Sequence, residues 1–255
     1  KKKFLINKKT FFFYGWLFGF GYFFTNLYWI SISLTFDVNF KFLIPITIIL
    51  IPAFLGIFYG LATFLLFTLK FKKTLSLFFL FALLLGLVEF LRGIILTGFP
   101  WNLISYSFSN QLEVLGIVSI IGTYAFNLIC ISLFTSPAIF LLKDSKKDLG
   151  VIIFFIIMII FFYFYGLNYK EKFNKAEKNY YDYKIRVIGS NVGLERFYKN
   201  VDSVSVIQDL IKISNPDNKK KTIFIWPEGI LPDILQKELI EYRWLFEKKF
   251  SENHL

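Results

Sequence analysis

The stretch from Ile44 to Leu69 contains no charged side chain. A helix of that length crosses a hydrocarbon core of about 30 Å, whereas a soluble protein interrupts so long an apolar run with charges. Lipid offers no hydrogen-bond partners, so the backbone amides of a crossing segment must bond within a helix. With 56% hydrophobic residues, the first two thirds of the chain do not fit an ordinary soluble domain. We therefore predict a membrane protein.

Four further apolar stretches resemble this one, so the sequence predicts a polytopic α-helical membrane domain over residues 1–168. The segments between the stretches are too short to hold anything but connections. About five helices are expected, at residues 11–34, 44–69, 75–97, 113–142 and 149–168.

The net charge of +11 is distributed by loop rather than over a nucleic-acid-binding face. Lysines gather in residues 1–9, 70–73 and 143–147, whereas the alternate loops carry few. Positive loops stay on the cytoplasmic side of a membrane. The sequence therefore places the segment after Leu167 on the opposite side, and we expect no nucleic-acid partner.

The chain has one cysteine, Cys130, and one histidine, His254. A disulfide within the chain is therefore impossible, and neither a histidine-dependent triad nor a histidine-rich metal site can be assembled. Cys130 lies in an apolar span, where a thiol is inert and serves packing. No glycine-rich phosphate loop is present either, so we expect neither a metal nor a cofactor.

The composition changes at Tyr169, where residues 169–183 form a charged linker. Residues 184–189 then alternate as a strand, 202–213 place apolar residues at helical spacing, and 222–226 form a second strand that Pro227 stops. A further helix is expected from Pro232 to about Phe250. This order begins an α/β domain over residues 184–255, and Glu228 follows its second strand, where such folds carry their chemistry.

Several motifs together resemble the apolipoprotein N-acyltransferases of the bacterial inner membrane. The most specific is Glu89–Gly93 followed by Thr97–Asn102, which is similar to that family's membrane signature. Trp226–Glu228 resembles the first catalytic motif of its nitrilase-like domain, and Gly15–Phe23 looks like its third span. The resemblance covers nearly the whole chain.

The resemblance implies a carbon-nitrogen-hydrolase domain with an α-β-β-α sandwich fold, facing the periplasm. It also implies a Glu, Lys and Cys triad that moves an acyl chain from a phospholipid to the enzyme cysteine as a thioester. The acyl chain then passes to the amino group of the diacylglyceryl-cysteine of an apolipoprotein. Glu228 matches the triad glutamate and would act as general base. The family's Lys and Cys fall beyond Leu255, so we expect a piece truncated at both ends and inactive alone.

Glu89, Arg92, Trp101 and Asn191 are candidate substrate-binding residues by the same resemblance. The chain departs from the family after the first strand of the tail, where an aromatic residue of Phe197–Tyr198 replaces a tryptophan.

Each candidate also has an ordinary interpretation. Glu228 would then be an exposed strand-end residue, Glu89 and Arg92 would neutralise each other on one helix, and Trp101 would anchor a helix at the interface. Two other functions stay open. A membrane-tethered amidase would share the Glu228 motif, and a non-enzymatic transporter or scaffold would need polar residues in several spans.

Overall fold

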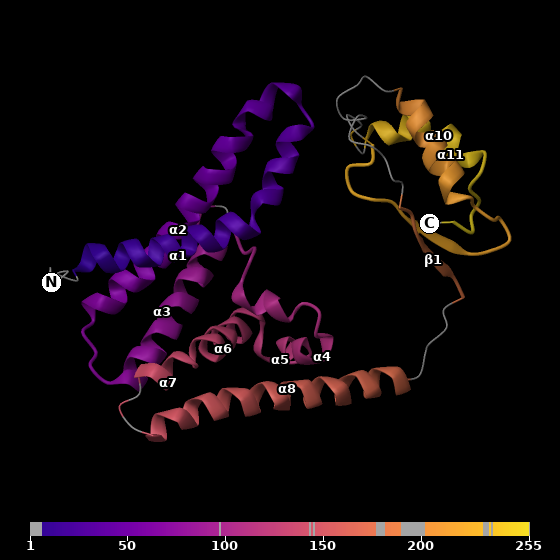
Figure 1. Cartoon of the computed structure of the whole chain (residues 1–255). Helices are drawn as coiled ribbons and strands as arrows, with labels where there is room; N and C mark the ends of the chain where they lie inside the picture. The colour runs from indigo at the N-terminus through magenta and orange to yellow at the C-terminus, as the bar shows by residue number, and fades with distance from the viewer. Residues whose placement is uncertain are drawn as a thin grey trace. The chain divides into compact units, whose positions relative to one another are not determined.

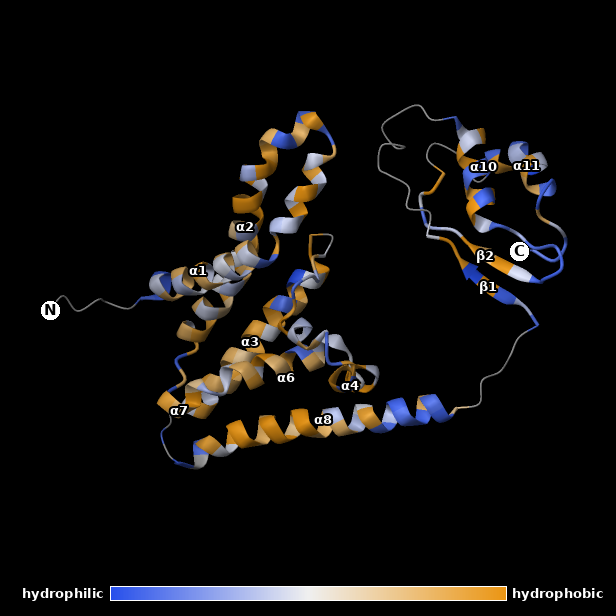
Figure 2. Cartoon of the chain, turned by 45° about the vertical axis from the view of Figure 1, so that its right-hand side comes forward, coloured by the Kyte–Doolittle hydropathy of each residue, from blue (hydrophilic) through white to orange (hydrophobic). Residues whose placement is uncertain are grey.

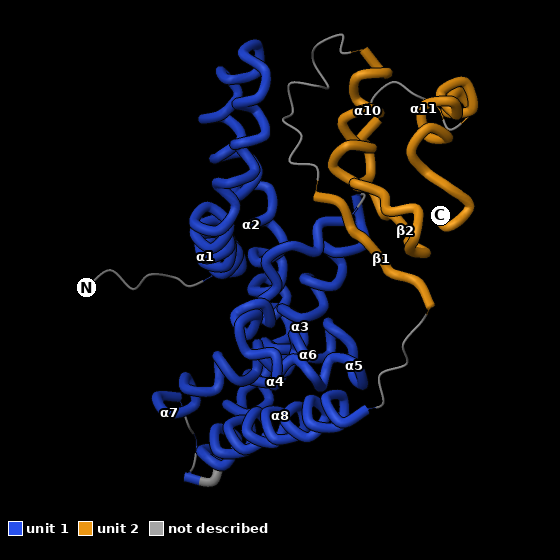
Figure 3. Tube along the Cα trace, turned by 90° about the vertical axis from the view of Figure 1, so that its right-hand side faces the viewer, with its two compact units in different colours: residues 1–176 blue, residues 177–255 orange. Residues whose placement is uncertain are grey.

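The computed structural model describes residues 7–96, 98–142, 144, 146–176, 182–189, 202–231, 235 and 237–254. The chain divides into two compact units, residues 1–176 and 177–255 (Figure 3). The first unit is helical and the second holds a small parallel sheet with helices.

Three helices of the first unit are long and apolar enough to cross a membrane. They are Val38–Thr68, which joins a 3₁₀ turn to α2 (Ile44–Thr68), then α3 (Thr74–Ile94) and α8 (Gly150–Lys175). Figure 2 shows α8 hydrophobic over most of its length and hydrophilic at its C-terminal end, where its lysines gather. Most apolar side chains of α8 are exposed, as lipid-facing side chains are.

Two of the five expected helices differ from the sequence-based division. The first expected helix, 11–34, is α1 (Lys8–Asn26) followed by a 3₁₀ helix, η1 (Tyr28–Thr35). The expected helix 113–142 is divided into four pieces by three breaks. Gly122 adopts a positive φ of 78° at the second break, and Pro137, at the third, lacks the N–H that a helix interior needs. The pieces are α4 (Leu112–Leu115), α5 (Val118–Ile121), α6 (Thr123–Thr135) and α7 (Ala138–Leu142).

Helices α1 and α2 run side by side (Figure 1). Glycines at a four-residue spacing on the two helices face one another. A Cβ added to Gly19 would lie 2.9 Å from the Cα of Gly56, and a Cβ on Gly56 would lie 3.0 Å from the carbonyl oxygen of Trp16. Small residues at this spacing let membrane helices approach closely. The paired motifs are Gly15 with Gly19 and Gly56 with Gly60.

The second unit contains a two-stranded parallel sheet of β1 (Lys184–Val187) and β2 (Thr222–Ile225), with Lys184 opposite Thr222. Helix α10 (Ser203–Ser214) connects them, and the Asp202 carboxylate caps its first N–H groups. Ile207 and Ile211 of α10 pack on Leu245 in α11 (Arg243–Glu247). The helix expected from 232 to 250 is instead a 3₁₀ helix, η5 (Glu238–Tyr242), and α11, while residues 232–234 and 236 lie outside the described part.

Candidate functional site

Glu89, on α3, is fully buried at 0% exposure and receives hydrogen bonds on both carboxyl oxygens. The Tyr59 hydroxyl of α2 donates to Oε1 at 2.5 Å, and the Asn127 amide of α6 donates to Oε2. Burying a carboxyl group is costly unless its oxygens are bonded, and these two donors meet that need. The carboxyl group thereby joins three helices.

The orientation of Asn127 is fixed by a second contact. Its Oδ1 accepts a hydrogen bond of 2.9 Å from the backbone N–H of Ser105. The amide NH₂ of Asn127 must therefore face Glu89, so residue 89 must present a hydrogen-bond acceptor there. Ser105 lies in η3 (Ile104–Phe108), which follows the loop after α3.

Arg92 lies one helical turn after Glu89 and holds the loop that follows α3. Its Nη1 donates to the carbonyl oxygens of Phe99 at 2.7 Å and Trp101 at 2.8 Å. The guanidinium also lies over the ring of Phe23, 5.0 Å from its centroid, which is a cation–π contact. Arg92 is 1% exposed, and its Nε and Nη2 are buried without a hydrogen-bond partner in the described structure.

Four successive carbonyl groups of this loop, residues 99–102, accept hydrogen bonds from side chains. Besides the two that Arg92 holds, Pro100 accepts from the Tyr106 hydroxyl at 3.2 Å and Asn102 from the Tyr22 hydroxyl at 3.1 Å. Partial burial raises the pKa of Tyr106, so this phenol keeps its proton and remains a donor.

Three residues of the loop after α3 adopt positive φ angles, and the hydrogen bonds to the loop carbonyl groups help to hold these strained conformations. Leu96 and Asn102 have φ values of 51° and 57°, and Gly98 has 81°. Non-glycine residues at positive φ cost about 1 to 3 kcal/mol each. The Trp101 side chain is 54% exposed at this supported loop, so it is available for contacts outside the unit.

The structure thus brings Glu89, Arg92 and Trp101 into one region, as their proximity in sequence suggests, but Glu89 and Arg92 bond to different partners. Sequence reasoning missed Tyr59 and Asn127, which complete the cluster. A polar residue within an apolar span is the signal that identifies Asn127. Tyr59 gives no comparable signal, because aromatic residues are frequent throughout this chain.

Glu228 belongs to the second unit, in the turn after β2. Trp226 anchors this turn, because its Nε1 donates to Ser214 Oγ at 2.9 Å and its ring lies 5.6 Å from that of Phe246. Glu228 is exposed two residues later, and Gly229 has a positive φ of 68° that turns the chain. The carboxylate therefore lies beyond the carboxyl end of a parallel strand, where α/β folds bind ligands.

The remaining sequence candidates are not placed. Asn191 and Thr97 lie outside the described residues. Within the described part of the chain, no three His, Cys, Asp or Glu residues are grouped so that they could hold a metal ion.

Comparisons with known proteins agree with the motifs. Residues 2–136 match the family described as apolipoprotein N-acyltransferase N-terminal domain. The chain is 28% identical over 241 residues to the apolipoprotein N-acyltransferase of Rhodopseudomonas palustris, covering 88% of this chain and 43% of that protein. It is 29% identical over 228 residues to that of Rhizobium rhizogenes, covering 87% of this chain and 42% of that protein.

The chain therefore spans less than half the length of these curated relatives, at 42–43%. The predicted resemblance to this family is confirmed. Because the matched domain takes in more than half of the chain, the chain belongs to the apolipoprotein N-acyltransferase family.

Proposed function

We propose that the protein to which this chain belongs is an apolipoprotein N-acyltransferase. It transfers an acyl chain from a phospholipid, through a cysteine thioester, to the α-amino group of the diacylglyceryl-cysteine of an apolipoprotein. Family membership and the relatives' names support this reaction. The observation that carries the site assignment is Glu228, exposed beyond a parallel strand in a turn that the partly buried Trp226 anchors.

Glu228 is proposed as the general base of a nitrilase-like triad. It takes the proton of the nucleophilic thiol, which then attacks the phospholipid ester, and it later takes a proton from the incoming amine. The resemblance does not place the triad's Lys and Cys among these 255 residues. Cys130 does not fit the role, because it is fully buried in α6 of the helical unit. The reaction is accordingly proposed for the longer protein, and this chain alone is expected to be inactive.

The polar cluster of the first unit is proposed to organise the membrane-facing entrance for the substrates. Glu89 and Arg92 are fully buried, which supports a positioning role and argues against simple contact with a bulky lipid. Arg92 holds the loop by two carbonyl groups, and the exposed Trp101 side chain is the part of the loop able to touch an acyl chain or headgroup. Asn191 remains a candidate contact in the second unit.

The proposed location is the bacterial inner membrane, with the second unit in the periplasm. The support is the charge asymmetry: Lys70, Lys72 and Lys73 lie between α2 and α3. The other end of α3 carries the loop with Trp101 and no further lysine before Leu112. By the positive-inside rule the lysine-rich ends are cytoplasmic.

The test uses the chain within a protein of its relatives' full length, with phosphatidylethanolamine and a diacylated lipopeptide. General-base catalysis contributes about 10² to 10⁴ in rate, so we expect Glu228→Gln to slow acyl transfer at least about a hundredfold. Glu252→Gln is the matched control, because Glu252 is an exposed carboxylate of the same unit. Full activity of the Glu228→Gln variant would refute the assignment, and ammonia release from simple amides would favour an amidase instead.

A further inference from the structure

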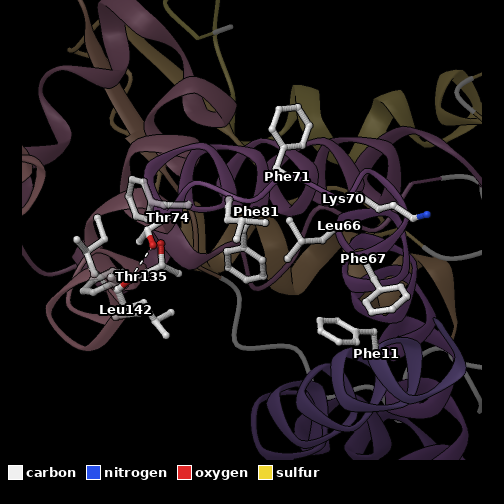
Figure 4. A pocket seen from close by; sticks show the side chains of 14 residues that line it. Phe11, Leu66, Phe67, Lys70, Phe71, Thr74, Phe81, Thr135 and Leu142 are labelled. Atoms are coloured by element: carbon white, nitrogen blue, oxygen red, sulfur yellow. Dashed lines mark hydrogen bonds between the residues drawn. The ribbon is translucent and has the colours of Figure 1, made fainter. Parts of the chain in front are cut away.

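A cavity of about 710 Å³ lies between the helices of the first unit (Figure 4). Its wall combines side chains from α1, α2, α3, α6 and α7, and most of them are aromatic or aliphatic. Its volume is in the range of sites that hold a drug-sized ligand. Representative lining residues are Phe11, Phe67, Phe81, Phe134 and Ile139.

This cavity is separate from the site around Arg92. Thr74, at the first turn of α3, lines the cavity, and Arg92 lies eighteen residues later on the same helix. At 1.5 Å per residue, this spacing puts the two about 27 Å apart along the axis, close to the thickness of a hydrocarbon core. The cavity therefore opens near the opposite membrane surface from the loop that holds Trp101.

The two hydroxyl groups of the wall are already bonded within the protein. The Thr74 hydroxyl donates to the Leu142 carbonyl oxygen at 2.7 Å, and the Thr135 hydroxyl donates to the Ile131 carbonyl oxygen at 2.7 Å. The wall thus presents an apolar surface. An occupant that gains from this cavity must be a hydrocarbon group, because a polar one would lose its water without gaining partners.

Lys70 lies at the edge of this apolar wall and is the one lysine among the lining residues. Figure 4 shows its ammonium directed away from the neighbouring aromatic rings. Its backbone has a positive φ of 51° at the end of α2, a conformation that usually belongs to glycine. A lysine with a positive φ has a strained backbone conformation, and such strain is often retained where the residue has a function.

The charges around the opening favour an anion. Lys72 and Lys73 are exposed in the same connection between α2 and α3. The nearby carboxylate of Asp144 is engaged at the start of α3, where it accepts from the Thr74 N–H at 2.8 Å. Lysines next to a gap between membrane helices are the arrangement that binds anionic lipid headgroups.

We propose that this cavity binds an anionic phospholipid of the leaflet at the lysine-rich helix ends. An acyl chain lies among the Phe67, Phe81 and Phe134 side chains, and the phosphate lies beside Lys70. The occupant is a lipid because one molecule supplies both the hydrocarbon that the wall requires and the anion that the edge requires. This binding is independent of acyl transfer, since the cavity and the loop that holds Trp101 lie at opposite ends of α3.

The test counts lipids bound to the longer protein by native mass spectrometry, with dioleoylphosphatidylglycerol added to delipidated protein in detergent. Removing one lysine contact weakens binding to an anionic lipid about fivefold. We expect that loss for Lys70→Gln, and little change for the control Lys72→Gln, because Lys72 does not line the cavity. Dioleoylphosphatidylcholine should bind more weakly and respond less to Lys70→Gln.

A second pair of variants tests the hydrocarbon part. Ala138→Trp places an indole ring in the cavity and should weaken lipid binding, whereas Leu141→Trp should not, because Leu141 is 84% exposed and outside the lining. Equal lipid binding by Lys70→Gln and Lys72→Gln would overturn the proposal even if Ala138→Trp fails to fold. Equal binding by both tryptophan variants would also overturn it, because the lipid would then bind outside this cavity.

Discussion

Removal of one hydroxyl group, by Tyr59→Phe, tests whether the buried polar cluster stabilises the helical unit. The Tyr59 hydroxyl donates to Glu89 Oε1 at 2.5 Å, and both residues are at most 2% exposed. The phenyl ring keeps its packing in the variant, including its edge-to-face contact with Phe23 at 5.4 Å. The change therefore deletes a hydrogen bond and little else.

The magnitude follows from the burial of the pair. Hydrogen bonds between membrane helices average about 0.6 kcal/mol, with a maximum of about 1.7 kcal/mol. Hydrogen bonds to charged groups in soluble proteins are worth about 1.5 to 3 kcal/mol. Water cannot replace the lost donor at a fully buried carboxyl group, so we expect the upper part of the membrane range, about 1.5 kcal/mol.

Cys130 provides the assay. It is 0% exposed and lies one turn after Asn127 on α6, so a thiol-reactive fluorophore reaches it only when this helix separates from its neighbours. Any cysteine outside this chain is replaced by serine for the measurement. When opening is fast relative to labelling, the rate is proportional to the open population. A loss of about 1.4 kcal/mol is a tenfold change, so Tyr59→Phe should be labelled about ten times faster.

Two measurements separate this explanation from a general loss of stability. Tyr14→Phe is the control, because Tyr14 is 61% exposed on α1, and its labelling rate should not change. In a Glu89→Met background, which offers the phenol no oxygen acceptor, Tyr59→Phe should cost much less, since the cycle isolates the pair. Equal labelling of Tyr59→Phe and wild type, or full additivity of the two changes, would refute the reasoning.

Two further predictions concern other parts of the chain. Gly56→Leu should lower the yield of folded, monodisperse protein in gel filtration, since overpacking costs about 1 to 3 kcal/mol. Gly21→Leu should not, because a Cβ added at Gly21 meets open space. In the second unit, hydrogen bonds from the Lys220 ammonium and the Lys219 N–H hold the pKa of Asp217 below its usual value. Its stabilising contribution is complete above the unfolded pKa of about 3.9 and is lost as pH falls through the lower folded pKa. A carboxyl NMR titration should show that Lys220→Gln raises this pKa, and an unchanged titration would contradict the assignment.

The local elements that the sequence predicts well are those with strong and continuous patterns. The lack of charged residues predicts a membrane helix over residues 44–69, and the structure gives α2 over nearly the same range. Residues 202–213 show helical spacing of apolar residues, and the structure gives α10 over nearly the same range, with the Asp202 carboxylate as its N-cap. The sequence predicts one helix over residues 113–142, which is wrong, because hydrophobicity does not indicate the positive φ of Gly122 that separates α5 from α6.

In the candidate site, too, some residues can be predicted from the local sequence and others cannot. Motif spacing identifies Glu89, Arg92 and Glu228, because a charged residue in a span or after a strand is conspicuous. The partners of Glu89 lie thirty residues before it and thirty-eight residues after it, and nothing in the local pattern connects them. Their contact requires the packing of α2, α3 and α6, which hydropathy does not specify.

The sequence by itself determined that the chain enters a membrane and which family it belongs to, because long uncharged runs and short motifs are local properties. Only the tertiary structure decided how Tyr59 and Asn127 satisfy Glu89, and that Arg92 bonds to the loop carbonyls of Phe99 and Trp101. The physical reason is that a buried polar group must find partners wherever packing brings donors and acceptors together. Those partners come from helices that are distant in sequence, so their identity follows from the fold.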